Sequence, residues 1–271
     1  MEFYKFQCLG NDYVVVEEKE NIDYKSIAPK LCNRAIGIGA LGLIVISKDY
    51  SKFTYYNYNG EIVNRISKGL FEFFEYLKIN DIKLKNKLKF ITSFFEIEAI
   101  PNNELTSIKV GKPNYKNQML GINDDIDSFG RLLKIDDMHY TIYSLYLGEI
   151  FTIIFVDSFD NYISSNGNLI SNNKLFKKKT NVCFVKKLDE YNIKVKVYDY
   201  INEYEEFSLM SAAACVAVGK KLEILSHNVD VHYEYGTINV TVDKKENISI
   251  NGRSTLIYKG ELIWLKVVMW R

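Results

Sequence analysis

The most constraining feature of this sequence is a run of small and apolar residues near its C-terminal end. Residues 208–225 read SLMSAAACVAVGKKLEIL, and nearly every side chain before Gly219 is small or apolar. A helix that is apolar on all sides has no face to give to water, so other elements have to enclose it. The run therefore predicts a buried central helix.

Most of the remaining sequence has the character of strands. Runs rich in β-branched and aromatic residues recur along the chain, and several of them alternate as half-buried strands do; examples are DYVVVEE, KFTYYNYN, FTIIFVD and IKVKVYDY. A second helical pattern spans 65–80, and a shorter helix is expected within 21–40, ending near Gly37 and Gly39. The face of the 65–80 helix that repeats with helical spacing carries Ile66, Leu70, Phe73, Phe74 and Leu77.

The order of these elements indicates two copies of one plan. FTYYNYNG leads through a glycine turn into the helix at 65–80, and IKVKVYDY leads through an acidic loop into the helix at 208–225. More strands follow each helix. The polar, turn-rich interval from about 102 to 123 is the best candidate for a boundary between the two halves.

Composition excludes several classes of function. Lys+Arg is 35 against Asp+Glu 34, which gives no general attraction to nucleic acid or to an anionic membrane. Four cysteines stand singly, so neither a zinc site nor a disulfide framework is expected. The N-terminus lacks the pattern of a signal peptide, and Gly148 and Glu149 interrupt the longest apolar run. We therefore expect a cytoplasmic protein that spans no membrane.

Five stretches of the chain, taken in order, resemble the motifs of diaminopimelate epimerases. KFQCLGNDYVVVE at 5–17 is similar to their H-G-L-G-N-D-F, and RAIGIGALGLIVI to G-I-G-x-D-G-L. YYNYNGEIVNRISKG at 55–69 resembles F-N-A-D-G-S-x-x-x-x-C-G-N-G, and KKTNVCFV resembles R-x-N-V-x-F-V. VYDYINEYEEFSLMSAAACVAVG resembles V-x-E-R-G-x-G-E-T-x-A-C-G-T-G-A-C-A-x-A-V-A-V-G. The motifs are spread along the chain in the family's order, and the similarity covers nearly the whole chain without large gaps.

The resemblance implies an α/β (α+β) fold of two pseudo-symmetric halves, each a curved mixed sheet wrapped around a central helix, with the site between them. We expect a first half at 1–115, completed by a C-terminal strand at 262–271, and a second half at 116–261. In that family epimerisation needs no cofactor. One Cys thiolate takes the α-proton of an amino acid and a second Cys returns a proton to the other side. Each Cys lies at the N-terminus of a central helix, which holds the substrate carboxylate and lowers the thiol pKa.

Both positions of these catalytic cysteines carry other residues here. An ungapped alignment puts Ile66 on the first cysteine and Ser208 on the second. Isoleucine carries no acidic proton, and a serine hydroxyl is a far weaker general base than a thiolate. Cys215 lies two turns inside its helix and is interpreted as core, as are Cys8 and Cys183 in their strand-like contexts. The alignment therefore excludes a symmetric two-thiol epimerisation.

The residues that bind substrate in the family are also altered. Glu149 falls in the loop that reads G-N-P-H in the family, and Asp199-Tyr200 replaces its E-R pair. These changes favour a larger or less charged ligand than a small zwitterion with two ionised ends. The candidate substrate-binding residues are Asn11, Asn57, Ser67, Gly69, Asn181, Asp199, Tyr200, Leu209 and Met210.

One hypothesis is an isomerase of this fold that uses acid–base chemistry without thiols. Lys68 beside the positive end of a helix is a candidate base, since its pKa would be lowered there. Glu149, Asp199 or Glu205 is the candidate on the opposite side, and Ser208 is a candidate hydrogen-bond donor or weak acid. The structural alternatives are a solvated lysine, a solvent-facing loop carboxylate, and an ordinary helix N-cap serine.

The other hypothesis is a catalytically silent homologue that binds an amino-acid-like ligand, a peptide or a protein partner. Loss of both thiols, the arginine and the histidine is what relaxed chemistry would produce. Under either hypothesis we expect no metal, no cofactor and no diaminopimelate epimerase activity. Family members often pair, so a homodimer is compatible with the resemblance, although no self-complementary surface is evident in the sequence.

Overall fold

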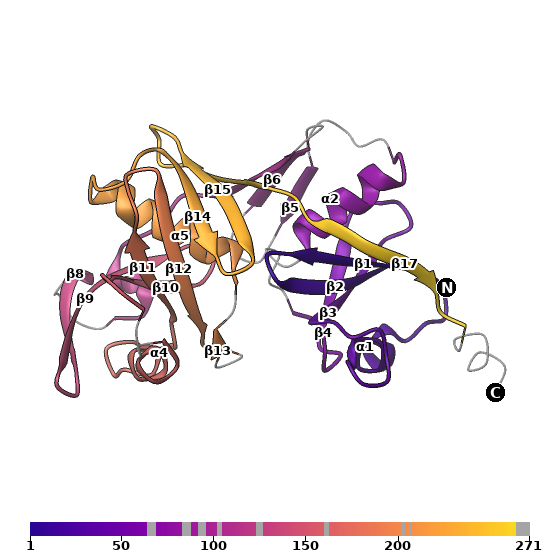
Figure 1. Ribbon diagram of the computed structural model, residues 1–271, viewed down its shortest axis with the longest axis horizontal. Coiled ribbons are helices and arrows are strands. Elements are labelled where there is room, and N and C mark those ends of the chain that lie inside the picture. The colour runs from indigo at the N-terminus through magenta and orange to yellow at the C-terminus, as the bar shows by residue number, and fades with distance from the viewer. Residues whose placement is uncertain are drawn as a thin grey trace. The chain divides into compact units, whose positions relative to one another are not determined.

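The computed structural model describes residues 1–63, 69–82, 88–91, 96–101, 105–122, 127–159, 163–201, 204–205 and 207–263. The chain divides into two compact units (Figure 1). The first comprises Met1–Thr92, Glu98–Thr106 and Gly252–Arg271, and the second comprises Ser93–Ile97 and Ser107–Asn251.

The first unit is built on a five-stranded mixed sheet in the order β17-β1-β2-β3-β4. Its β2 and β3 run parallel, and the other neighbours are antiparallel. The strands are β1 (Glu2–Cys8), β2 (Asn11–Glu17), β3 (Gly42–Ile46), β4 (Phe53–Asn57) and β17 (Thr255–Glu261), with helices α1 (Tyr24–Cys32) and α2 (Leu70–Ile79). Strand β5 (Leu88–Ile91) also lies in this unit, and β6 (Glu96–Pro101) is divided between the two units.

The two helices of this unit cover opposite faces of its sheet. Leu31 of α1 shares a buried cluster with Phe3 and Val14. On the other face, the ring of Tyr76 in α2 meets that of Tyr4 edge-on, with 4.9 Å between centroids. Burial on both faces explains why β2 and β3 read as continuous apolar runs rather than as alternating patterns.

The second unit has a larger mixed sheet, in which the strands follow the order β7-β16-β15-β14-β12-β11-β10-β9-β8, with β13 paired to β12. The pairs β10–β11 and β12–β14 are parallel. The strands are β7 (Thr106–Gly111), β8 (Phe129–Ile135), β9 (Met138–Tyr146), β10 (Ile150–Phe155), β11 (Asn181–Lys187), β12 (Asn192–Asp199), β13 (Tyr204–Glu205), β14 (Asn228–Tyr233), β15 (Gly236–Val242) and β16 (Ile248–Gly252). The helices are α3 (Asn117–Leu120), α4 (Ile163–Ser171) and α5 (Leu209–Lys221).

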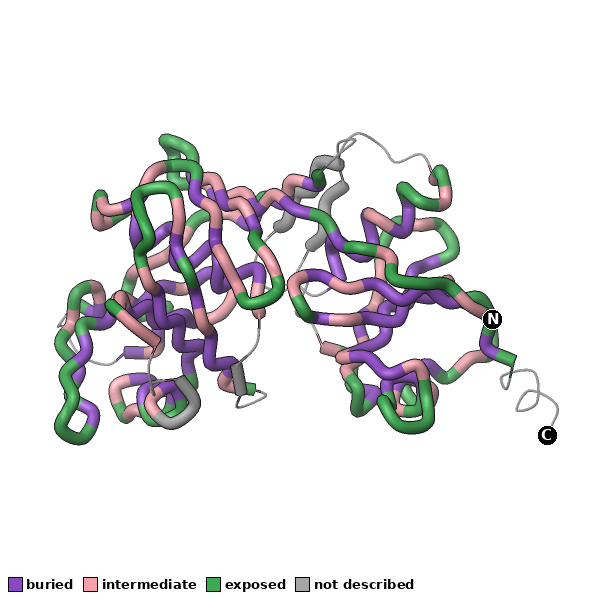
Figure 2. Tube along the Cα trace, viewed as in Figure 1, coloured by how far each residue is buried: buried purple, intermediate pink, exposed green. Residues whose placement is uncertain are grey.

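Helix α5 is the core of the second unit. Every residue from Leu209 to Gly219 is buried (Figure 2), and strands β10, β11 and β15 pack against the helix. A Cβ at Gly219 would lie 2.2 Å from the side chain of Leu225, so this turn of the helix needs glycine. The predicted buried central helix is confirmed.

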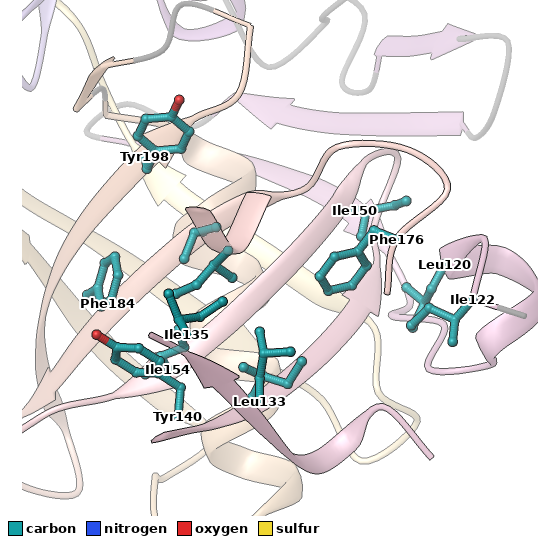
Figure 3. Packing of buried hydrophobic residues seen from close by; sticks show 13 residues of the cluster. Leu120, Ile122, Leu133, Ile135, Tyr140, Ile150, Ile154, Phe176, Phe184 and Tyr198 are labelled. Carbon is teal, nitrogen blue, oxygen red and sulfur yellow. The ribbon is translucent and has the colours of Figure 1, made fainter. Parts of the chain in front are cut away.

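The other face of this sheet is covered by α3 and α4. Leu120 and Ile170 from these helices share a buried cluster with Ile154, Phe184 and Tyr198 from the strands (Figure 3). Along β11, Phe184 points into this cluster while Cys183 interacts with Cys215 of α5. Each unit is therefore a sheet between helices, and the predicted mixed α/β (α+β) class is confirmed.

The chain returns to the first unit through β17, which pairs antiparallel with β1. The sequence analysis places the returning strand at 262–271, and residues 264–271 lie outside the described residues. Among the described residues, no helix has the length and apolarity to cross a membrane.

Candidate functional site

Three hydroxyl groups form hydrogen bonds around the first turn of α5. Ser208 is the N-cap: its Oγ accepts a hydrogen bond from the N–H of Ser211 (3.4 Å), and the Ser211 hydroxyl donates to the Ser208 carbonyl (2.6 Å). Tyr233 of β14 donates to the same carbonyl (3.3 Å), and its hydroxyl lies 3.1 Å from Ser211 Oγ. Burial raises the pKa of Tyr233 well above its ordinary value. Ser208 therefore has the capping role that the sequence analysis gave as its structural alternative.

Glu149 and Asn181 are brought together by the start of β11. Glu149 lies in the turn between β9 and β10, where Gly148 has φ 75°. Asn181 is only 2 % exposed, and its Nδ2 donates to Glu149 Oε2 at 2.9 Å. Its Oδ1 is buried and has no partner among the described residues. An unmet acceptor beside a carboxylate suits the N–H or O–H donor of a ligand.

Asp199 lies at the same end of the sheet. Strands β11 and β12 are antiparallel, and Val182 pairs with Tyr198. Asn181 precedes Val182 and Asp199 follows Tyr198, so this register puts Asp199 opposite Asn181. Asp199 is 4 % exposed, and its Oδ1 accepts the N–H of Ile201 at 2.9 Å. Tyr200 follows directly and is partly exposed. Four predicted site residues of the second unit therefore gather where β10, β11 and β12 meet their loops.

Leu209 and Met210 open α5 and are both buried. Their side chains belong to the core, so any contact with a ligand would come from the backbone N–H groups of the first turn. Such groups have no partner within a helix and attract anions.

In the first unit, Asn11 opens β2 and is 8 % exposed. It pairs with Cys8 across the turn Leu9-Gly10, where both residues have positive φ (51° and 91°), as a tight two-residue hairpin requires. Paired residues share a face of the sheet, so Asn11 and Cys8 both face α2, as Tyr4 does.

Asn57 has a local role in the structure. Its Oδ1 accepts the N–H groups of Asn59 (3.0 Å) and Glu61 (2.9 Å), and its Nδ2 donates to Glu61 Oε2 (2.8 Å). The amide thus holds the turn that follows β4.

Gly69 is the N-cap of α2, with φ 93° and no side-chain cap. Ile66, Ser67 and Lys68 lie outside the described residues, as does the side chain of Glu205. Their predicted roles stay predictions.

All four cysteines are buried and free. Burial raises the pKa of Cys8 and of Cys215 well above the ordinary value, and that of Cys32 to about 12. Cys215 lies well inside α5, where it interacts with Cys183 of β11. Since a thiolate is the reactive form, these surroundings disfavour thiol chemistry.

One feature that the sequence analysis missed is Glu72, in the first turn of α2. It is 2 % exposed, its Oε1 is buried without a partner among the described residues, and burial raises its pKa to about 7. The signal was present in LFEFFEYL, where this acid stands between Phe71 and Phe73. Among the described residues, no group of three or more His, Cys, Asp or Glu side chains could hold a metal ion.

No protein-family model matches the chain. The solved structures that share its fold include a phenazine biosynthesis protein of the PhzF family from Bacillus anthracis and a hydroxyproline epimerase from Agrobacterium vitis. The first has a TM-score of 0.66 at 14% identity and covers 97% of this chain and 99% of its own. The second has a TM-score of 0.56 at 10% identity and covers 96% and 91%.

Similarity in sequence is more specific. The chain is 30% identical over 272 residues to the diaminopimelate epimerase of Caldanaerobacter subterraneus, and the alignment covers 97% of this chain and 99% of that protein. The chain belongs to the diaminopimelate epimerase family.

Proposed function

We propose that this protein is an isomerase that moves a proton at the α-carbon of an amino-acid-derived or peptide substrate, using oxygen acids and bases in place of thiols. Membership of the epimerase family supports the reaction class. Ile66 and Ser208 at the positions of the family's two cysteines support the absence of thiol chemistry. Burial of all four cysteines supports it as well.

The observation that carries the proposal is the Asn181–Glu149 pair. Asn181 Nδ2 donates a hydrogen bond to Glu149 Oε2, and Asn181 Oδ1 is an acceptor without a partner among the described residues. A substrate amino group would satisfy this oxygen and bring the α-carbon toward the carboxylate. A buried polar atom without a hydrogen-bond partner costs stability, and a ligand donor at Asn181 Oδ1 would offset that cost.

In the proposed step, the Glu149 carboxylate accepts the α-proton. The C–H bond breaks, an O–H bond forms on Glu149, and the electron pair stays on the α-carbon, delocalised into the neighbouring carbonyl. The first-turn N–H groups of α5, including those of Leu209 and Met210, would bind the carboxylate where this charge gathers. A proton from solvent then forms a new C–H bond with this electron pair on the opposite face, Glu149 returns its proton to solvent, and the product is the epimer.

The substrate is proposed to differ from LL-diaminopimelate. Tyr200 stands where the family has an arginine, and Phe151 where it has a histidine. Turnover of LL-diaminopimelate by the purified protein, at a rate comparable with that of a thiol epimerase, would refute this part of the proposal.

Deuterium entry from D₂O tests the reaction itself. We expect a panel of L- and D-amino acids, N-acylated amino acids and short peptides to contain a substrate whose α-carbon acquires deuterium, detected by mass spectrometry and NMR. Glu149→Gln should slow this exchange by about 100-fold or more, the range of a general base. Glu190→Gln changes an exposed acid of the same unit and is the matched control. Absence of exchange across the panel would favour the silent, ligand-binding alternative.

A further inference from the structure

Thr180, the residue before β11, places a hydroxyl group beside the backbone of both members of the Asn181–Glu149 pair. Its side chain is fully buried. Thr180 Oγ1 is a donor to the carbonyl of Ile150 (3.2 Å) and to that of Asn181 (3.1 Å). Ile150 directly follows Glu149 in the chain. One hydroxyl therefore contacts the main chain of Asn181 itself and of the residue after Glu149.

A row of buried hydroxyl groups supports Thr180 in this position. Its Oγ1 lies 3.0 Å from Thr152 Oγ1, which lies 3.1 Å from Ser144 Oγ. A hydroxyl has one proton to donate. Because the Thr180 proton goes to a carbonyl, Thr180 accepts from Thr152, and Thr152 accepts from Ser144. All three side chains are fully buried, so water does not compete for these hydrogen bonds.

Strand pairing alone does not require this hydroxyl. Strands β10 and β11 already pair in parallel from Phe151–Asn181 to Phe155–Val185. The Thr180 main chain is fixed separately, since the buried Ser171 hydroxyl of α4 donates to its carbonyl at 2.7 Å. The Thr180 hydroxyl adds contacts at the start of both strands, where the Asn181–Glu149 pair lies.

Resting on the function proposed above, we propose that Thr180 is a positioning residue for the reaction, because its hydroxyl fixes the backbone from which Asn181 reaches Glu149. The pair depends on the 2.9 Å hydrogen bond between Asn181 Nδ2 and Glu149 Oε2. A rotation of the Asn181 main chain would move Nδ2 away from the carboxylate and Oδ1 away from the substrate amino group. A shift of about 1 Å in such groups can cost on the order of 100-fold in rate.

The first test compares variants by the rate of deuterium exchange into the substrate found by the D₂O panel. Thr180→Val keeps the shape of the side chain and removes the hydroxyl, and it should lower kcat by about 10- to 100-fold. Thr180→Ser keeps the hydroxyl and should restore most of this loss. Thr152→Val is the matched control, because Thr152 Oγ1 contacts the hydroxyls of Ser144 and Thr180 rather than the two carbonyls. It should lower folding stability in urea as Thr180→Val does, with kcat close to the wild-type value.

The second test needs no substrate. The side-chain amide protons of Asn181 are identified in a nitrogen–proton correlation NMR spectrum by their absence in Asn181→Asp. In Thr180→Val these protons should change chemical shift and exchange faster with solvent, because the bond to Glu149 is weakened. Thr180→Ser and Thr152→Val should leave both properties near those of the wild type.

Equal losses of kcat in Thr180→Val and Thr152→Val would show a general effect of packing and overturn the inference. An unaltered Asn181 amide signal in Thr180→Val would overturn it as well, whether or not the wild type is active. Circular dichroism checks folding; if Thr180→Val does not fold, Thr180→Ala carries the same comparisons, since it leaves room for water beside the carbonyls. No exchange by the wild type defeats the proposed function and, with it, the role of Thr180 in the reaction.

Discussion

Helix α5 of the second unit and helix α2 of the first begin in contrasting ways. Ser208 caps α5 in an extended conformation (φ −141°), and Ser211 and Tyr233 complete a closed set of hydrogen bonds. Gly69, the N-cap of α2, lies in the left-handed region (φ 93°) and offers no side chain to cap the helix, while Glu72 in the first turn has a carboxyl oxygen without a hydrogen-bond partner among the described residues.

The difference teaches that the first turns of two central helices can differ in how completely their polar groups find hydrogen-bond partners. A helix end whose donors and acceptors find hydrogen-bond partners within the same chain is stabilised by them. A helix end that buries an unmet carboxyl group is destabilised, and such local cost is typical of functional sites. The three predictions that follow test this contrast through folding stability.

The largest effect is expected from Glu72→Gln. The pKa of Glu72 is raised from 4.5 to about 7 in the folded state, so the protonated form is preferred there. Stability from this group is fully present below pH 4.5 and is lost as pH rises through 7. We compare the free energy of unfolding of the wild type with that of the variant at each pH. Above pH 7 this difference should be about 3 kcal/mol less favourable to the wild type than it is at low pH. Urea unfolding from pH 4.5 to 8.5 measures this, with Glu75→Gln as the control.

If the gap between wild type and Glu72→Gln stays constant over that pH range, Glu72 is not held as a buried acid, and the contrast between the two helix ends disappears.

A smaller effect is expected at Gly69. Its φ of 93° is strained for any residue with a Cβ, and a Cβ there would lie 2.9 Å from Ile44 Cδ1 and 3.1 Å from Phe53 Cε2. Gly69→Ala should lower the free energy of unfolding by about 2 kcal/mol. Gly111→Ala is an informative control, because its φ of 87° is similar while nothing lies within 4 Å of the added Cβ. Equal costs in thermal unfolding would mean that packing at the start of α2 adds nothing to backbone strain.

The smallest effect is expected at the capped helix. Ser208→Ala removes the acceptor for the Ser211 N–H and should cost about 1 kcal/mol, whereas Ser208→Gly should cost only a few tenths. Chemical denaturation of both variants checks this order. Its reversal, or a loss of several kcal/mol in Ser208→Ala, would indicate that the serine does more than cap the helix.

Much of the fold could be predicted from sequence because its signals are local or periodic. The apolar run at 208–225 leaves no polar face, so burial of α5 follows without knowledge of its neighbours. Five motifs in order were likewise enough to indicate the family before any coordinates. Of the residues that gather where β10, β11 and β12 meet their loops, Asn181 and Asp199 came from these motifs, and Glu149 came from the loop aligned with the family's G-N-P-H.

Only the tertiary structure decided which polar groups have hydrogen-bond partners. The Asn57 side chain accepts a hydrogen bond from the N–H of Asn59 in its own turn. The Ser208 carbonyl accepts a hydrogen bond from the hydroxyl of Tyr233, which is 25 residues away in the chain. Asn181 reaches Glu149 across 32 residues, yet keeps one oxygen unmet. Glu72 reads as one acid in a helix until the packing of α2 on its sheet buries it. Hydrogen-bond partners distant in sequence depend on register and packing, and neither is written in the local pattern of residues.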